Sequence, residues 1–147
     1  MSYTSLIDVQ EATMATKKQH PVIVLLERDL QIQAVVDRML TLLTRDCRII
    51  IARNQPHLFS LLAKRNVTLL ITNYDRVGLN GIQLAEAAKR SSPATRVLVI
   101  TGSTEPDLEA KAQAASVDFF LFKPFTLQPI EAVLRAVLPA ENLRPSK

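Results

Sequence analysis

The sequence has a single cysteine, Cys47, among its 147 residues. One cysteine excludes a disulfide within the chain and a cysteine metal cluster, and its setting in the stretch CRIIIA predicts a buried, unreactive thiol. No apolar run approaches the roughly 20 residues that a helix needs to cross a bilayer. The first twenty residues also lack a signal peptide, because their basic residues follow the apolar stretch instead of preceding it. We therefore expect a cytoplasmic protein without a membrane segment.

A long basic helix and aromatic residues interleaved with basic ones are also missing. The formal net charge is +4, but only 5% of the residues are aromatic. Lysine and arginine occur as short pairs that begin at Lys17, Lys64 and Lys89, which is typical of solvated helix ends. Nucleic-acid surfaces usually combine clustered cations with aromatic rings or a basic helix, so we do not expect direct binding of nucleic acid.

The chain does contain five short apolar runs rich in β-branched residues, and stretches of helical period alternate with them. The runs cover residues 22–26, 48–52, 67–72, 96–101 and 118–122, and the first four are continuous enough to be buried on both faces. Alternation of this kind predicts one α/β domain with a doubly wound, five-stranded parallel sheet and helices on both faces. We place the domain at residues 21–138, with tails at 1–20 and 139–147. A short helix over Ser5 to Ala12 is the alternative for part of the first tail.

Local sequence signals predict where two helices begin and indicate that one helix is weakly docked. Thr104 is a candidate cap for the fourth helix, with Pro106 and Asp107 in its first turn, and Thr126 is one for the fifth. The inner positions of the fourth helix are mostly alanine, which predicts little buried area and weak docking. These positions are Ala110, Ala112, Ala114 and Ala115.

Polar side chains stand at the carboxyl ends of the expected strands. Doubly wound sheets bind their ligands at this edge. These side chains form a set of acid, amide, hydroxyl and amine groups: Glu27, Arg28 and Asp29; Asn73, Tyr74 and Asp75; Thr101, Gly102 and Ser103; and Lys123 before Pro124.

These features resemble the receiver domain of bacterial two-component response regulators over about residues 21–138. The match consists of Glu27 closing the first strand, a polar residue closing the third with Gly81 eight positions later, Thr101 closing the fourth, and FLFKPF with Lys123 and Pro124. The resemblance implies the flavodoxin-like receiver fold with strand order 2-1-3-4-5. It also implies a cis peptide before Pro124, and it places Ser116 where the family usually has a glycine in a left-handed turn.

Two positions depart from the family pattern. An active receiver holds Mg²⁺ with an acid pair that here becomes Glu27 and Arg28, and it phosphorylates an aspartate that here becomes Asn73. A neutral amide is too weak a nucleophile to form an acyl phosphate, and Mg²⁺ needs carboxylate ligands. Thr101 and Lys123 are kept, and Phe120 takes the position of the aromatic switch residue. We therefore predict no catalytic residue, no metal ligand, and lost or weak Mg²⁺ binding.

Three functions remain open from the sequence. The first is a non-enzymatic pseudo-receiver in bacterial signal transduction or transcriptional regulation, which binds a protein such as a histidine kinase or regulator through the fourth helix, fifth strand and fifth helix. A homodimer through the same face is a variant of it. The second is a phosphoacceptor that uses Asp75, although pairing with Arg28 is the more economical role for this carboxylate. The third is an anion or small-molecule binder that uses Asn73, Thr101 and Lys123; Lys123 is also expected to bind Glu27 or the Asn73 carbonyl.

Overall fold

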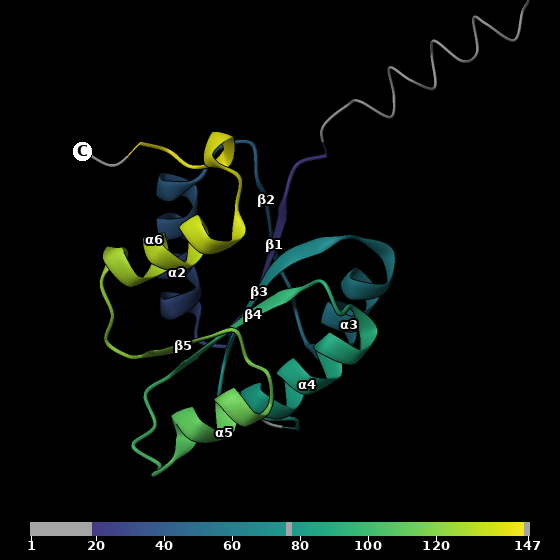
Figure 1. The fold of residues 1–147 in the computed structure, drawn as a ribbon, viewed down its shortest axis with the longest axis vertical. Coiled ribbons are helices and arrows are strands. Elements are labelled where there is room, and N and C mark those ends of the chain that lie inside the picture. The colour runs from purple at the N-terminus through teal and green to yellow at the C-terminus, as the bar shows by residue number, and fades with distance from the viewer. Residues whose placement is uncertain (1–18, 76–77, 146–147) are drawn as a thin grey trace, which may run out of the picture.

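The computed structural model describes residues 19–75 and 78–145 and contains a five-stranded parallel sheet with strand order β2-β1-β3-β4-β5 (Figure 1). This confirms the predicted fold class and strand order. In chain order the elements are β1 (Val22–Leu26), α2 (Leu30–Leu43), β2 (Arg48–Ile51), α3 (Gln55–Lys64), β3 (Val67–Asn73), α4 (Gly81–Ser91), β4 (Arg96–Thr101), α5 (Leu108–Ala114), β5 (Phe119–Phe122), α6 (Leu127–Val137) and the 3₁₀ turn η1 (Ala140–Asn142).

The sheet separates two layers of helices, each with its own apolar core. Helices α2 and α6 lie side by side over one face, and α3, α4 and α5 lie over the other (Figure 1). Alternate residues of β1 serve the two cores: Val24 packs toward α3 and α4, whereas Ile23 and Leu25 pack toward α2 and α6. This is the expected outcome of the period-two side-chain pattern in a strand covered on both faces.

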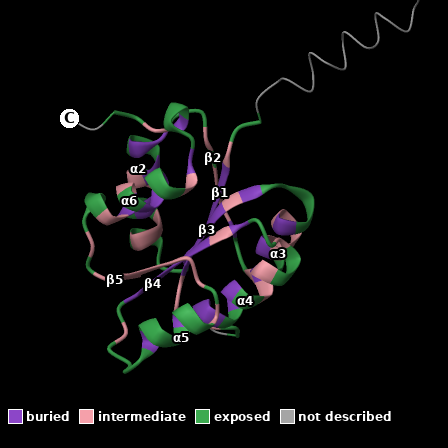
Figure 2. Cartoon of the chain, in the orientation of Figure 1, coloured by how far each residue is buried: buried purple, intermediate pink, exposed green. Residues whose placement is uncertain are grey.

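One of the four strands expected to be buried on both faces is only half-buried. Strands β1, β3 and β4 are mostly buried, but β2 begins with exposed Arg48 and continues with partly exposed isoleucines (Figure 2). The prediction was wrong for β2 because this strand is at the edge of the sheet and has a neighbour on one side only. An apolar run in the sequence does not distinguish an edge strand from a central one.

The start of α5 differs from the prediction. The helix begins at Leu108 and not after Thr104, and its first flanking residue, Asp107, has a left-handed φ of 63° and no capping hydrogen bond. The Ser103 hydroxyl instead accepts the Glu105 amide hydrogen at 3.1 Å, which holds the preceding residues as a loop. Thr126 does stand at the N-cap of α6 as predicted, although its side chain makes no capping hydrogen bond.

Helix α5 is the shortest α-helix in the described part of the chain and buries two side chains, Leu108 and Ala112. Ala110 and Ala114 are exposed, so the expectation that they face the core was wrong. The helix has only seven residues, so just two of its positions reach the core below it. Ser116 has a φ of 63°, which confirms a left-handed residue after this helix.

Residues 139–145 are not a tail. The buried Asn142 donates from Nδ2 to the Arg45 carbonyl at 3.1 Å, and the Arg144 amide donates to the Leu43 carbonyl at 2.9 Å. These carbonyls belong to or follow the last turn of α2, where backbone oxygens lack partners within the helix. The segment therefore supplies hydrogen-bond donors to the backbone oxygens at the carboxyl end of α2. Residues 1–18, with the alternative helix at Ser5 to Ala12, lie outside the described residues.

No helix in the described part of the chain combines the length and the apolar character that a membrane span requires.

Candidate functional site at the carboxyl edge of the sheet

Strand register brings the predicted site residues to one edge of the sheet. Leu26 lies opposite Thr72, Asn73 opposite Ile100, and Thr101 opposite Phe122. The residues that close or follow β1, β3, β4 and β5 therefore leave the sheet together: Glu27, Arg28, Asn73, Asp75, Thr101 and Lys123.

Glu27 is buried, and both of its carboxylate oxygens have partners. Oε2 accepts the Asp29 amide hydrogen at 3.1 Å, and Oε1 lies 3.5 Å from Lys123 Nζ. The peptide bond between Lys123 and Pro124 is cis, as the resemblance implied. The contact between Lys123 and Glu27 confirms one of the two partners expected for this lysine. The ammonium group of Lys123 thereby neutralises a buried carboxylate.

Asp29 has a structural role beside Glu27. Its carboxylate accepts the amide hydrogens of Gln31 at 2.9 Å and Ile32 at 3.2 Å, which caps the start of α2. The acid is therefore engaged by backbone N–H groups of the first helical turn.

The Asn73 side chain is turned toward its own loop. It is half-buried, and its Nδ2 donates to the Asp75 carbonyl at 3.1 Å. A carboxylate at this position has no hydrogen to donate and cannot make this bond. The amide thus stabilises the loop after β3 in a manner available to asparagine but not to ionised aspartate.

The loop after β3 returns closely to the start of α4 at Gly81. The Gly81 amide donates to the Tyr74 carbonyl at 2.9 Å. A Cβ atom at Gly81 would lie 2.6 Å from the Asn73 carbonyl oxygen and 2.8 Å from the Tyr74 Cα. The glycine recognised from its spacing is therefore required by close contact between backbone segments.

Arg28 and Asp75 do not form the expected ion pair. Both are exposed, and no salt bridge joins them among the residues that the structure describes. Pairing of exposed charges gains little free energy in water, which offers a physical reason for the wrong prediction.

Thr101 and Phe120 occupy the positions predicted for them. Thr101 is buried, and its hydroxyl oxygen accepts the Ser103 amide hydrogen at 2.9 Å. Phe120 is half-buried, packs against the core formed with α4 and α5, and meets the Phe122 ring edge-on at 5.1 Å. Thr101 therefore contacts the loop that leads into α5, and Phe120 contacts the core beneath that helix.

A polar chain across the site was missed by the sequence reasoning. The Tyr74 hydroxyl donates to Glu105 Oε2 at 3.0 Å, and Lys111 Nζ contacts Glu105 Oε1 at 2.9 Å. Desolvation and the bond to Glu105 raise the pKa of Tyr74, whereas Lys111 and Tyr74 lower the pKa of Glu105. The contact ties the loop after β3 to the loop before α5. Its only sequence signal is that Tyr74 directly follows Asn73.

The side chains at this edge do not suit a Mg²⁺ ion, which prefers carboxylate and other oxygen ligands. Glu27 is engaged by Lys123, Arg28 brings a cation, and Asn73 supplies a neutral amide. Across residues 19–75 and 78–145, no three or more His, Cys, Asp or Glu side chains cluster as a metal site. His57 does not belong to such a cluster, and its Nδ1 accepts the Arg53 amide hydrogen at 3.0 Å.

The fold and this edge define a class of protein: a doubly wound α/β domain with polar residues gathered at the carboxyl ends of its strands. The family model of the response regulator receiver domain matches residues 23–135. The chain therefore belongs to the receiver domain family of response regulators, whose members are signalling modules.

Solved structures agree with this assignment. The signal receiver domain of an HD domain-containing protein from Pseudomonas fluorescens Pf-5 is 25% identical, with a TM-score of 0.72 over 81% of this chain and 94% of that one. A CheY-like response regulator receiver domain protein from Methanospirillum hungatei JF-1 is 15% identical, with a TM-score of 0.71 over 80% and 93%. Chemotaxis protein CheY4 from Vibrio cholerae is 18% identical, with a TM-score of 0.69 over 82% and 100%. A comparison with curated proteins gives no match.

Proposed function

We propose that this receiver domain acts as a pseudo-receiver, which binds a protein partner without accepting a phosphoryl group. The observation that carries the proposal is the Asn73 side chain, which stands at the phosphoacceptor position and donates from Nδ2 to the Asp75 carbonyl. An amide is a poor nucleophile toward phosphorus, and this one is held in a loop contact. Phosphoryl transfer at this position has no suitable attacking group.

The charge at the site supports the same proposal. Phosphoryl transfer depends on a metal ion that neutralises the transferred group. Glu27 already neutralises Lys123, and the neighbouring Arg28 repels a divalent cation. We therefore expect weak Mg²⁺ binding or none.

Asp75 is a poor replacement acceptor. It is exposed, and the described residues around it do not form a cluster of three or more possible metal ligands. The alternative of an anion site at Asn73, Thr101 and Lys123 is disfavoured because the Glu27 carboxylate already holds the only ammonium in that set.

The partner surface that we propose is formed by α5, β5 and α6 and is called the α5/β5/α6 face below. Phe122 and Leu127 on this face are 49% and 40% exposed. The Tyr74–Glu105–Lys111 chain connects α5 to the degenerate site, and it holds the helix without a phosphoryl group. A histidine kinase, another regulator or a second copy of the chain would bind here.

Phosphorylation is tested by incubation with a small acyl phosphate and Mg²⁺, followed by intact-mass measurement. The expected result is no phosphoryl adduct on the wild-type chain. An adduct that disappears in Asp75→Ala but persists in the control Asp37→Ala would favour the phosphoacceptor alternative and contradict the proposal.

The interaction surface is tested by sedimentation and by titration with candidate kinases. Phe122→Asp should weaken association, whereas Leu42→Asp on α2, which changes a residue that is 54% exposed, should not. The reverse result would move the interface to α2.

A further inference from the structure

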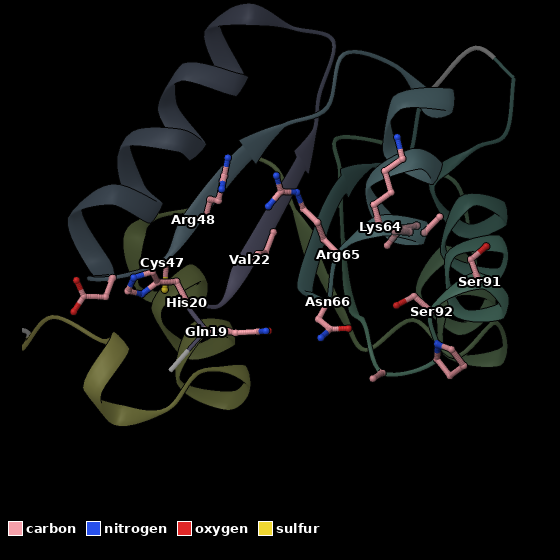
Figure 3. Close-up of a pocket in the computed structure, with 15 residues that line it drawn as sticks. Gln19, His20, Val22, Cys47, Arg48, Lys64, Arg65, Asn66, Ser91 and Ser92 are labelled. Atoms are coloured by element: carbon pink, nitrogen blue, oxygen red, sulfur yellow. The ribbon is translucent and has the colours of Figure 1, made fainter. Parts of the chain in front are cut away.

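The opposite edge of the sheet contains a groove that takes no part in the receiver site. It has a volume of about 1120 Å³ and lies at the amino ends of β1, β2 and β3 (Figure 3). Its lining comes from the segment before β1, the start of β2, the α3–β3 connection and the α4–β4 connection.

The groove brings together cations that are far apart in the sequence. Val22 at the start of β1 lies opposite Arg48 on one side and Val67 on the other, and Arg65 precedes Val67 by two residues. Figure 3 shows Arg48 and Arg65 on either side of Val22. Adjacent strands in a sheet are about 4.8 Å apart. Arg48 and Arg65 therefore belong to chain segments that lie close together on the two sides of one strand, β1.

These cations are not neutralised by neighbouring acids. Lys64 and both arginines lack a salt bridge within the described residues, and Asp46 is the one carboxylate in the lining. Burial raises the pKa of the Cys47 thiol, which keeps this group uncharged. The groove therefore has a positive potential that favours anionic groups.

The remaining lining indicates the kind of anionic partner. Ala63, Pro93 and Ala94 are exposed and add apolar surface beside the arginines. The described residues of the lining contain no Phe, Tyr or Trp on which a nucleic-acid base could stack. Guanidinium groups bind carboxylates in paired hydrogen bonds, and apolar surface binds aliphatic side chains.

We infer that this amino-edge groove binds an acidic peptide segment of a partner protein, with Arg48 and Arg65 pairing with its carboxylates and Ala63 and Pro93 contacting its aliphatic side chains. This inference is independent of the proposed function because it uses none of the residues at the carboxyl edge.

The test is fluorescence anisotropy with a short fluorescein-labelled peptide rich in Glu and Leu. Arg48→Ala with Arg65→Ala should weaken binding about tenfold, in line with the loss of close charge pairs. The control Arg38→Ala with Arg53→Ala removes the same charge from exposed positions outside the groove and should change affinity less than about twofold. Arg48→Lys with Arg65→Lys should give an intermediate loss because lysine retains charge without the guanidinium fork.

Three results would overturn the inference. They are no binding of the acidic peptide, equal weakening in the groove and control variants, and tighter binding of a single-stranded oligonucleotide that depends on Arg48 and Arg65. The last result would assign the groove to nucleic acid. Circular dichroism of each variant separates loss of binding from loss of folding.

Discussion

The two edges of the sheet hold their cations in different states. At the carboxyl edge, Lys123 is paired with buried Glu27, and Lys111 is paired with Glu105. At the amino edge, Arg48 and Arg65 face a groove without a salt bridge in the described structure. Both lysines at the carboxyl edge are therefore paired with acids, although exposed Arg28 there has no salt bridge within the described residues, whereas neither arginine of the amino-edge groove is paired with an acid.

The amino edge is itself divided. Near β4 and β5, Asp118 binds Lys89, approaches Arg96 Nε at 3.1 Å and accepts the Val97 amide hydrogen at 2.7 Å. Near β1, β2 and β3, the described lining of the groove contains one carboxylate, Asp46, which forms no salt bridge with Arg48 or Arg65. Asp118 thus pairs with two cations near β4, whereas the arginines near β1 have no acid in this role within the described residues.

The largest expected effect comes from restoring acids at the carboxyl edge. Arg28→Asp with Asn73→Asp should produce Mg²⁺ binding measurable by calorimetry, because two carboxylates then join Glu27. Asn73→Asp alone should restore little binding because Arg28 remains. The control Arg53→Asp with Asn73→Asp makes the same change in net charge. Strong Mg²⁺-dependent phosphoryl labelling of the single variant would contradict the argument about Arg28.

Gly81→Ala should cause the largest loss of stability. Its Cβ would lie 2.6 Å from a backbone oxygen, so α4 or the loop after β3 must move. We expect the free energy of unfolding to fall by about 2–3 kcal/mol, measured by urea denaturation. Gly102→Ala is the matched control, since its nearest contact would be 3.9 Å away and ordinary. Equal losses in both variants would rule out the close-contact explanation.

Asp118→Asn tests the paired half of the amino edge. Burial raises the pKa of Asp118, but Lys89, the Val97 amide and Arg96 outweigh it, so the folded pKa is below its ordinary value. The substitution should cost about 1–2 kcal/mol at neutral pH. The ionised carboxyl stabilises the fold above its unfolded pKa of roughly 3.9, and this stabilisation disappears as pH falls through the lower folded pKa.

The measurement for Asp118 is urea denaturation of wild type and Asp118→Asn from neutral to acidic pH. The difference in unfolding free energy should shrink at low pH. A difference that is constant over this range would assign the effect to packing and not to charge. Asp37→Asn, at a half-buried position on α2 without a recorded salt bridge in the described structure, is the control.

Tyr74→Phe should have the smallest effect on stability and a local effect on motion. Loss of the hydroxyl bond to Glu105 releases one link between the loop after β3 and the loop before α5. Amide hydrogen exchange should therefore accelerate in residues 102–107. Ultraviolet titration should assign a tyrosine pKa above the usual value of about 10 to Tyr74, with a return toward that value in Glu105→Gln. Unchanged exchange would show that the link does not hold the loop.

Much of the fold was predictable because the apolar residues have clear periods. The strands with continuous apolar runs and the striped helices were found, and their order gave the sheet. The burial of β2 was overestimated because its run IIIA looks like that of a central strand. The start of α5 was misplaced because Thr104 is a good cap residue, but Ser103 and Glu105 form a competing loop contact.

The carboxyl-edge site was predictable as a set of residues and less so as a set of contacts. Glu27, Asn73, Thr101 and Lys123 each close or follow a recognisable strand, so parallel pairing alone brings them to one edge. Pairing within the set was not fixed by spacing. Lys123 meets Glu27, whereas Arg28 and Asp75 remain apart because solvent competes for exposed charges.

The sequence by itself determined the alternation of strands and helices, the edge at which the polar residues gather, and the loss of acids at Arg28 and Asn73. These properties follow from local periodicity and residue chemistry. Tertiary structure decided the link from Tyr74 to Glu105 and the convergence of Arg48 and Arg65 around Val22. Those contacts join segments distant along the chain, so they exist only once the strand order and register are set.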